Sequence, residues 1–152
     1  MTFFRKTLPT YFAVFATLLS CPMMLLAHTY GDNGVCTDAD CTDPYEPPTL
    51  EGGWYLLGNA GNVEWFSARV NEGGNDTGLW GKLTADIDFT GVTHTPIGVS
   101  EGTKFNGRFD GQGHRILNLK LRTTKDLQGF FGGLRGGGTV VRRLIIDKSC
   151  VI

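Results

Sequence analysis

Residues 105–121 (FNGRFDGQGHRILNLKL) and residues 130–146 (FFGGLRGGGTVVRRLII) share a pattern of glycines and apolar residues at a shift of 130 − 105 = 25 positions. Self-similarity at a fixed period of this size is typical of a solenoid, in which each repeat is one winding of the chain. Apolar residues would stack from winding to winding, and glycines would lie at corners where a Cβ atom would clash. The alternative is a chance match in a glycine-rich chain, which explains matched glycines better than it explains glycines and apolar positions in one register. The predicted repeat positions are Phe105, Gly107, Phe109, Gly111, Gly113, Ile116, Leu119, Leu121, Phe130, Gly132, Leu134, Gly136, Gly138, Val141, Leu144 and Ile146.

The composition favours an all-β architecture. The chain has 152 residues, which suggests one domain, and all 22 of its glycines follow residue 30. A chain so dense in glycine after that point is dense in turns between short strands. The formal net charge is −1, so nothing indicates nucleic-acid binding.

The first 27 residues are typical of an export signal. Arg5 and Lys6 form a basic start, and no charged residue follows until Asp32. The sequence therefore predicts a signal peptide over residues 1–27 and a secreted or cell-surface location, at the outer membrane. Two alternatives remain: a transmembrane anchor, and a lipoprotein signal that would leave a lipid anchor on Cys21.

Residues 28–53 are rich in acidic residues and proline and predict an exposed linker. Cys36 and Cys41 lie close enough in sequence to form a small disulfide loop in an oxidising compartment. The acidic residues around them do not match a calcium-binding EF-hand loop, although a looser surface ion site is an alternative. Cys150 is left unpaired, and the sequence predicts no zinc site and no cofactor.

Residues 54–81 predict a short strand, Trp54 to Leu57, followed by one helix. Asn59 is a suitable N-cap, the apolar residues Val63, Phe66 and Val70 follow at helical spacing, and glycines end the helix. A helix at this place could cover the open end of the first winding. Residues 82–152 would form the windings themselves, beginning with an alternating strand from Lys82 to Phe89.

Three blocks resemble the glycine-rich repeat proteins that carry the GLUG motif: residues 55–74, residues 83–98 and residues 105–146. The match is close at FNGRFDGQGHRILNL (residues 105–119), whereas Arg142 and Arg143 stand where the family often has Lys-Asn. Proteins of this family are exported bacterial surface proteins, abundant in Bacteroidetes. The resemblance implies the N-terminal part of a right-handed parallel β-helix on the cell surface, and it implies no particular activity.

We therefore expect an adhesin, or a binding or spacer module, for glycans or host surface proteins, without catalysis. The aromatic residues Tyr55, Trp65, Trp80 and Phe131 are candidates for stacking on sugars, although residues of this size are more often buried in a core. The chain stops inside an apolar stretch, so we expect windings that are incomplete at the C-terminus. A truncated or split surface protein, or end-to-end self-association through the open last winding, would account for that.

The alternative function is a polysaccharide lyase or hydrolase that uses surface carboxylates. Its candidate residues are Asp86, Asp88, Asp110, His94 and His114. Structural roles explain them more simply: Asp86 and Asp88 on the solvent face of a strand, Asp110 accepting backbone N–H bonds in a turn, and His114 bonding beside it. The second repeat has Arg135 and Thr139 in place of Asp110 and His114, so the repeat does not need that pair.

Overall fold

The computed structural model describes residues 27–73, 78–121 and 127–151, and these residues form a small mixed α/β domain. Strands and helices follow one another along the chain as β1 (Thr49–Glu51), β2 (Trp54–Leu57), α1 (Ala60–Gly73), β3 (Trp80–Leu83), β4 (Ile87–Asp88), the 3₁₀ helix η2 (Glu101–Thr103), β5 (Arg108–Asp110), β6 (Arg115–Leu117), β7 (Val140–Arg142) and β8 (Ile145–Ile146).

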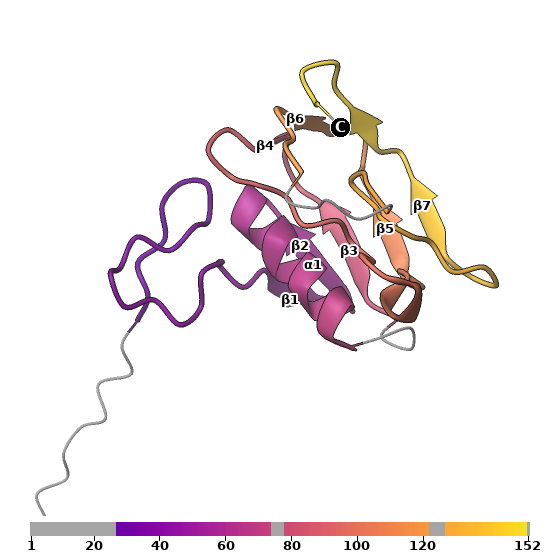
Figure 1. Ribbon diagram of the computed structural model, residues 1–152, viewed down its shortest axis with the longest axis horizontal. Helices are drawn as coiled ribbons and strands as arrows, with labels where there is room; N and C mark the ends of the chain where they lie inside the picture. The colour runs from indigo at the N-terminus through magenta and orange to yellow at the C-terminus, as the bar shows by residue number, and fades with distance from the viewer. Residues whose placement is uncertain (1–26, 74–77, 122–126, 152) are drawn as a thin grey trace, which may run out of the picture.

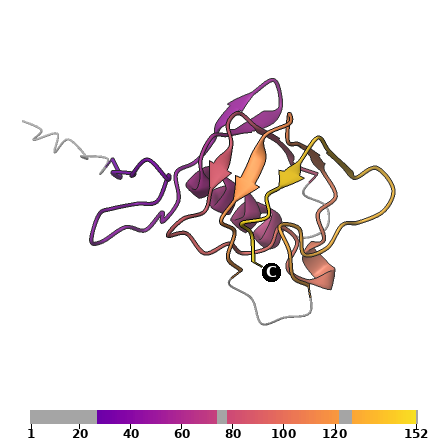
Figure 2. The same ribbon diagram turned by 90° about the horizontal axis from the view of Figure 1, so that it is seen from above.

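The strands form two sheets. The larger has the order β1-β2-β3-β5-β7, in which β1 pairs antiparallel with β2 and all the other pairs are parallel. The smaller has the order β4-β6-β8 and is parallel throughout. Figure 1 shows β2, β3, β5 and β7 side by side with α1 lying along them, and Figure 2 shows the same helix against one face of the strands. Residues 27–48, which we call the N-terminal segment, lie on the side of the domain opposite β7 (Figure 1).

Within the described residues the chain passes from the larger to the smaller sheet three times, as β3 to β4, β5 to β6 and β7 to β8. The single strand predicted from Lys82 to Phe89 is wrong, because the chain bends at Thr84 and Ala85 and enters the other sheet. The alternation read from that stretch is nevertheless present. Leu83, Ile87 and Phe89 are buried, while Thr84, Asp86 and Asp88 are exposed.

The prediction of an all-β, right-handed parallel β-helix is wrong. The described part of the chain holds one α-helix and two sheets, and it forms no closed solenoid. Two features account for the difference. The first strand pair is an antiparallel hairpin, and in place of a third sheet the chain after β4 makes isolated parallel bridges such as Ile97–Phe131 and Phe105–Leu134.

The 25-residue shift is also not the one that the strands use. Phe105 bridges to Leu134 and Phe109 pairs with Val141, at shifts of 134 − 105 = 29 and 141 − 109 = 32 residues. Ile116 pairs with Ile146, not with Val141 as the repeat predicted. A Cβ atom on Gly111 would lie 2.4 Å from the Arg143 carbonyl oxygen, whereas nothing lies within 4 Å of one on Gly136, so these two matched glycines do not occupy equivalent places.

Several glycines stand where a side chain cannot fit, and Gly107 is one of them. A Cβ atom on Gly107 would lie 1.8 Å from the carbonyl oxygen of Leu79, which belongs to the preceding passage of the chain. Such a distance is far inside van der Waals contact, so β3 and β5 approach this closely only because residue 107 has no side chain.

Helix α1 lies where the sequence predicted a helix. Asn59 caps it, because its side-chain oxygen accepts a hydrogen bond of 2.8 Å from the Asn62 amide. Val63, Phe66 and Val70 are buried. The Phe66 ring meets the rings of Phe105 and Phe109 edge-on at 6.1 Å. The helix therefore packs along several successive passages of the chain. Because these passages form no closed solenoid, the prediction that the helix covers the end of one is wrong.

Part of the segment predicted as a linker, residues 28–53, belongs to the larger sheet. β1 forms a hairpin with β2, and the connecting residues Gly52 and Gly53 have φ values of 56° and 83°. Positive φ at both central residues is the geometry of a type I′ turn, whose twist matches that of the strands. Nearer the N-terminus, the Gly61 amide of α1 donates to the Asn33 carbonyl at 2.7 Å.

None of the helices in the described ranges has the length and apolar character needed to cross a membrane. The predicted signal peptide, residues 1–27, lies outside the described residues except for Ala27, and so does Cys21, the site of the alternative lipid anchor.

Candidate ligand-binding surface

A row of side chains crosses the larger sheet from strand to strand. Arg108 of β5 lies opposite Trp80 of β3 on one side and opposite Val140 of β7 on the other. The ring of Trp54, from β2, lies beside that of Trp80 with 5.4 Å between their centroids. Residues in register across a sheet share a face, so these four side chains form one surface, which we name the tryptophan ladder.

The tryptophan ladder faces away from α1. The residues that alternate with it along the strands, Tyr55, Gly81 and Phe109, contact Phe66 of the helix. Successive residues of a strand point to opposite faces, so the ladder residues point outward. Both tryptophans are half-buried and Arg108 is exposed, which leaves aromatic surface open to a ligand.

The chemistry of this surface is aromatic and cationic. The guanidinium carbon of Arg108 lies 4.7 Å from the centre of the Trp80 ring, within the range of a cation–π contact. A hollow of about 210 Å³ is lined by Trp54, Arg108, Val140 and Arg142. Flat ring faces suit the C–H faces of a sugar, and the Arg108 guanidinium suits a carboxylate or sulfate substituent.

A second aromatic pair lies at the other side of the sheet, between β2 and α1. The rings of Tyr55 and Trp65 are 5.4 Å apart, and the guanidinium of Arg69 lies 5.0 Å from the Trp65 ring. A hollow of about 430 Å³ adjoins them and includes Glu72 and Leu79. Tyr55 and Trp65 are partly buried and also pack against the hydrophobic core.

The four aromatic residues that the sequence predicted as candidates for sugar stacking lie in different parts of the fold. Phe131 is half-buried and packs against the core, with its ring 5.3 Å from those of Phe105 and Phe109. Trp80 is part of the tryptophan ladder. Sequence reasoning missed Trp54, although a signal was present: it is an odd number of positions from the buried Leu57, so alternation places it on the outer face.

The acidic candidates Asp86 and Asp88 are held in separate hydrogen-bond networks. Asp86 accepts bonds from the Arg115 amide at 2.9 Å and from its Nε at 3.0 Å, and these bonds lower the pKa of Asp86. Asp88 accepts bonds from the Asn118 amide group at 2.9 Å and from Thr90, which lower the pKa of Asp88 in the same way. Both carboxylates are thus held in the ionised form.

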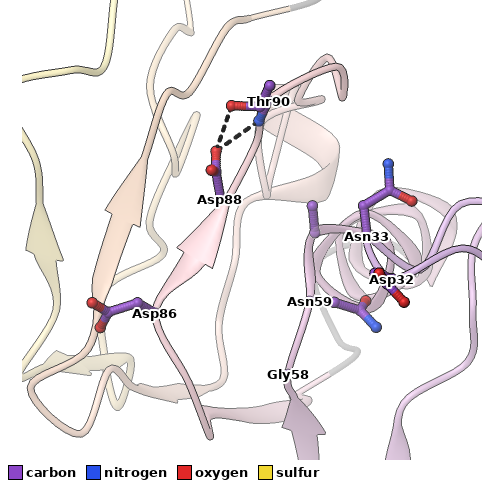
Figure 3. Close-up of a pocket in the computed structure, with 8 residues that line it drawn as sticks. Asp32, Asn33, Gly58, Asn59, Asp86, Asp88 and Thr90 are labelled. Carbon is purple, nitrogen blue, oxygen red and sulfur yellow. Dashed lines mark hydrogen bonds between the residues drawn. The ribbon is translucent and has the colours of Figure 1, made fainter.

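Asp86 and Asp88 border a hollow of about 300 Å³, shown in Figure 3, between the β3–β4 corner, the start of α1 and the N-terminal segment. Asp32 and Asn59 line its other side. An acid catalyst there would need a raised pKa, whereas the pKa of each of these two aspartates is lowered.

Asp110 links β5 to the end of β7 and to the residue that follows it. It is 5 % exposed and accepts hydrogen bonds from the Arg142 Nε at 3.0 Å and the Arg143 Nε at 2.9 Å. The amide of Gln112 also donates to it at 3.0 Å, as expected for an aspartate in a turn. His114 does not bond beside Asp110 as predicted, because its Nδ1 lies 3.4 Å from Asp86.

His94 is fully buried and pairs with Glu64 of α1, a residue that the sequence did not single out. Its burial removes it from any surface chemistry. The five candidate residues of a polysaccharide-processing enzyme therefore fall into separate networks, around Asp86 with His114, Asp88, Asp110, and His94 with Glu64.

Cys36 and Cys41 form a disulfide in the N-terminal segment, with 6.4 Å between their Cα atoms. Cys150 is free and half-buried, and its sulfur lies 3.3 Å from the Ile116 carbonyl oxygen. Comparisons with protein-family models, curated proteins and solved structures found no match for this chain.

Proposed function

We propose that this chain is an exported cell-surface binding module that holds a glycan on the tryptophan ladder and does not alter it chemically. The observation that carries the proposal is the in-register row of two half-buried tryptophans and an exposed arginine on an outer sheet face. A ligand would gain stacking on the rings without disturbing the core. The exposed Arg108 guanidinium beside the hollow favours a glycan with acidic substituents, whereas that of Arg142 is already paired with Asp110.

Export is supported by three features. Residues 1–27 have the charge and apolar pattern of a signal peptide. The Cys36–Cys41 disulfide fits an oxidising compartment outside the cytosol. Residues 54–152 resemble exported surface proteins with the GLUG motif. The tryptophan ladder is the surface on which this exported protein would bind its glycan.

We expect the Trp80→Ala variant to lose at least about tenfold in affinity for the bound glycan, because central aromatic residues dominate such contacts. The measurement is a screen of the full chain on an array of acidic and neutral glycans, followed by calorimetric titration of the best ligand. Arg108→Ala should weaken acidic ligands more than neutral ones, and the difference should shrink as salt is added.

The matched control is Trp65→Ala, which removes a half-buried tryptophan of the second aromatic pair and should leave the affinity near that of the parent. Loss of binding in Trp65→Ala but not in Trp80→Ala would contradict the placement on the ladder. A polysaccharide-cleavage assay run beside the screen tests the enzyme alternative, which would gain support from turnover that Asp110→Asn abolishes.

We also propose end-to-end self-association through β7 and β8, the last strands of their sheets. Val140, Ile145 and Ile146 are 40 %, 46 % and 42 % exposed there, next to unpaired strand edges. In sedimentation equilibrium the mass of the parent chain should rise with concentration, and Ile145→Lys should remain at the monomer mass. Leu50→Lys, at an exposed site on β1, should associate like the parent. A parent chain that stays monomeric throughout would refute the proposal.

A further inference from the structure

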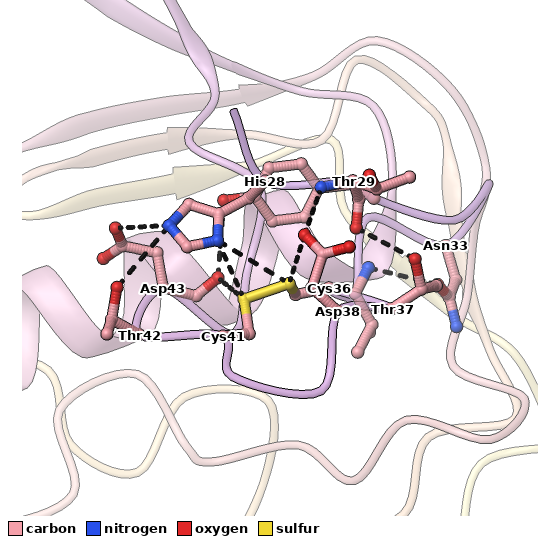
Figure 4. The surroundings of a disulfide bond; sticks show 11 residues. His28, Thr29, Asn33, Cys36, Thr37, Asp38, Cys41, Thr42 and Asp43 are labelled. Carbon is pink, nitrogen blue, oxygen red and sulfur yellow. Dashed lines mark hydrogen bonds and ion pairs between the residues drawn. A yellow bond between two sulfur atoms is a disulfide. The ribbon is translucent and has the colours of Figure 1, made fainter. Parts of the chain in front are cut away.

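The N-terminal segment brings a histidine against both cysteines of the disulfide. Nδ1 of His28 lies 3.3 Å from the sulfur of Cys41 and 4.0 Å from that of Cys36. Nδ1 of His28 and the two sulfurs all lie within 4.8 Å of one another. Figure 4 shows the His28 ring beside the disulfide. Within the described residues, this is the one group of at least three His, Cys, Asp or Glu side chains so placed. It lies apart from the tryptophan ladder.

The other imidazole nitrogen already has partners. Nε2 of His28 lies 3.5 Å from a carboxylate oxygen of Asp43 and 3.5 Å from the Thr42 hydroxyl. A carboxylate on one ring nitrogen fixes the tautomer with its proton on that side, which leaves a lone pair on the other. The lone pair of Nδ1 then faces the two sulfurs. This carboxylate–histidine arrangement is the one that orients histidine ligands in zinc sites.

The backbone holds the three groups together without the S–S bond. The Cys36 amide donates to the Pro44 carbonyl at 2.9 Å, and the Thr37 amide donates to the Thr29 carbonyl at 2.9 Å. Tyr30 bridges to Cys36 in an antiparallel pair. These hydrogen bonds cross between the start and the end of the loop, so cleavage of the disulfide would leave His28 and both cysteines close to one another.

We propose that Cys36, Cys41 and Nδ1 of His28 bind one zinc ion when the disulfide is reduced. The two cysteines would then form either the disulfide or, together with His28, the zinc site. A dithiol reductant would give two electrons and two protons to the S–S bond, making two thiols, and would itself become a disulfide. Each thiol then releases its proton as its sulfur binds the ion. Two thiolates and an imidazole suit zinc, and three protein ligands leave one position for water.

The test uses the full chain with Cys21→Ser and Cys150→Ser, so that only the two loop cysteines remain. A phosphine reduces the disulfide: its phosphorus takes the oxygen of one water molecule, and the two hydrogens go to the sulfurs. Cobalt(II), and then zinc, is titrated into the reduced and the oxidised chain. The absorption of cobalt reports both stoichiometry and thiolate ligation, through the sulfur-to-metal charge-transfer band.

The reduced chain should bind one cobalt per molecule with thiolate charge transfer, and zinc should displace it. Asp43→Asn should weaken binding about 10–100-fold, the usual effect of losing a carboxylate that orients a ligand. His28→Ala should weaken it further, while His114→Ala should bind like the parent. The helical circular dichroism signal of each variant is compared with that of the parent, to check that the domain stays folded. Oxidised chain that binds as tightly as reduced chain, or His28→Ala that binds as tightly as the parent, would overturn the proposal.

Discussion

Replacing His94 with alanine is expected to lower the free energy of unfolding by about 3–5 kcal/mol, the usual effect of breaking a buried ion pair by removing one partner. His94 is 0 % exposed and Glu64 is 2 % exposed. Nδ1 of His94 bonds to Glu64, and Nε2 lies 2.9 Å from the Phe130 carbonyl oxygen. Without the imidazole, the Glu64 carboxyl would be left in an apolar environment with one bond, from the Thr95 amide.

The loss would extend to packing. The imidazole stacks on the Phe130 ring at 5.1 Å and meets the Phe89 ring at 5.2 Å, so alanine would also leave a cavity. Chemical denaturation followed by circular dichroism measures the effect. His114→Ala is the control, because His114 is half-buried at the surface and its loss should be small. A His94→Ala variant as stable as His114→Ala would contradict the role assigned to the pair.

A double-mutant cycle separates the pair from the cavity. Glu64→Leu alone leaves Nδ1 of the His94 imidazole without its partner, whereas Glu64→Leu with His94→Leu replaces both polar groups by apolar ones. Because an apolar replacement of a buried ion pair is often neutral, the double variant should be more stable than either single variant. If the double variant lost as much unfolding free energy as the two single variants lose together, Glu64 and His94 would not stabilise the fold through each other.

Replacing Asp110 with asparagine is expected to lower the free energy of unfolding by about 2–4 kcal/mol, because buried, charge-assisted hydrogen bonds would be lost. The carboxylate of Asp110 accepts bonds from Arg142 at 2.8 Å and from Arg143 at 2.7 Å, both through Nη2. An amide offers one acceptor oxygen in place of two, so one guanidinium would face an NH₂ group. Asp147→Asn, at a less buried aspartate that accepts from the Ser149 amide, should have a much smaller effect.

The same carboxyl makes stability depend on pH. The hydrogen bond from Arg143, together with those from Gln112 and Arg142, holds the pKa of Asp110 well below its usual range. The folded protein therefore binds this proton more weakly than the unfolded chain, whose aspartates titrate near about pH 3.9. The stabilisation is complete above that pH and is lost as the pH falls below about 4 toward the folded pKa.

Urea denaturation of the parent chain between neutral pH and about pH 2 measures this loss, because the window lies below the unfolded pKa near about 3.9. Asp86, Asp88 and Asp147 have lowered pKa values and add to the loss in the same direction. The Asp110→Asn variant should lose less stability over this range than the parent. Equal losses in parent and variant would show that Asp110 does not contribute to the pH dependence.

Much of the local structure could be predicted from the sequence. The strand from Trp54 to Leu57, the helix after Asn59 and the buried face of Leu83 and Ile87 depend on neighbours a few residues apart. Capping, helical spacing and two-residue alternation are properties of such short stretches, so the sequence by itself determined them.

Only the tertiary structure decided which strands lie side by side and in which register. Glycine runs such as residues 136–138 carry no side chains that could specify a register, so Phe109 meets Val141 through packing against Phe66 and Phe130 and not through the 25-residue match. The same holds for the tryptophan ladder and the Glu64–His94 pair, whose members are distant in sequence. Their contacts depend on how the helix and the two sheets fill one core, and that is a property of the whole chain.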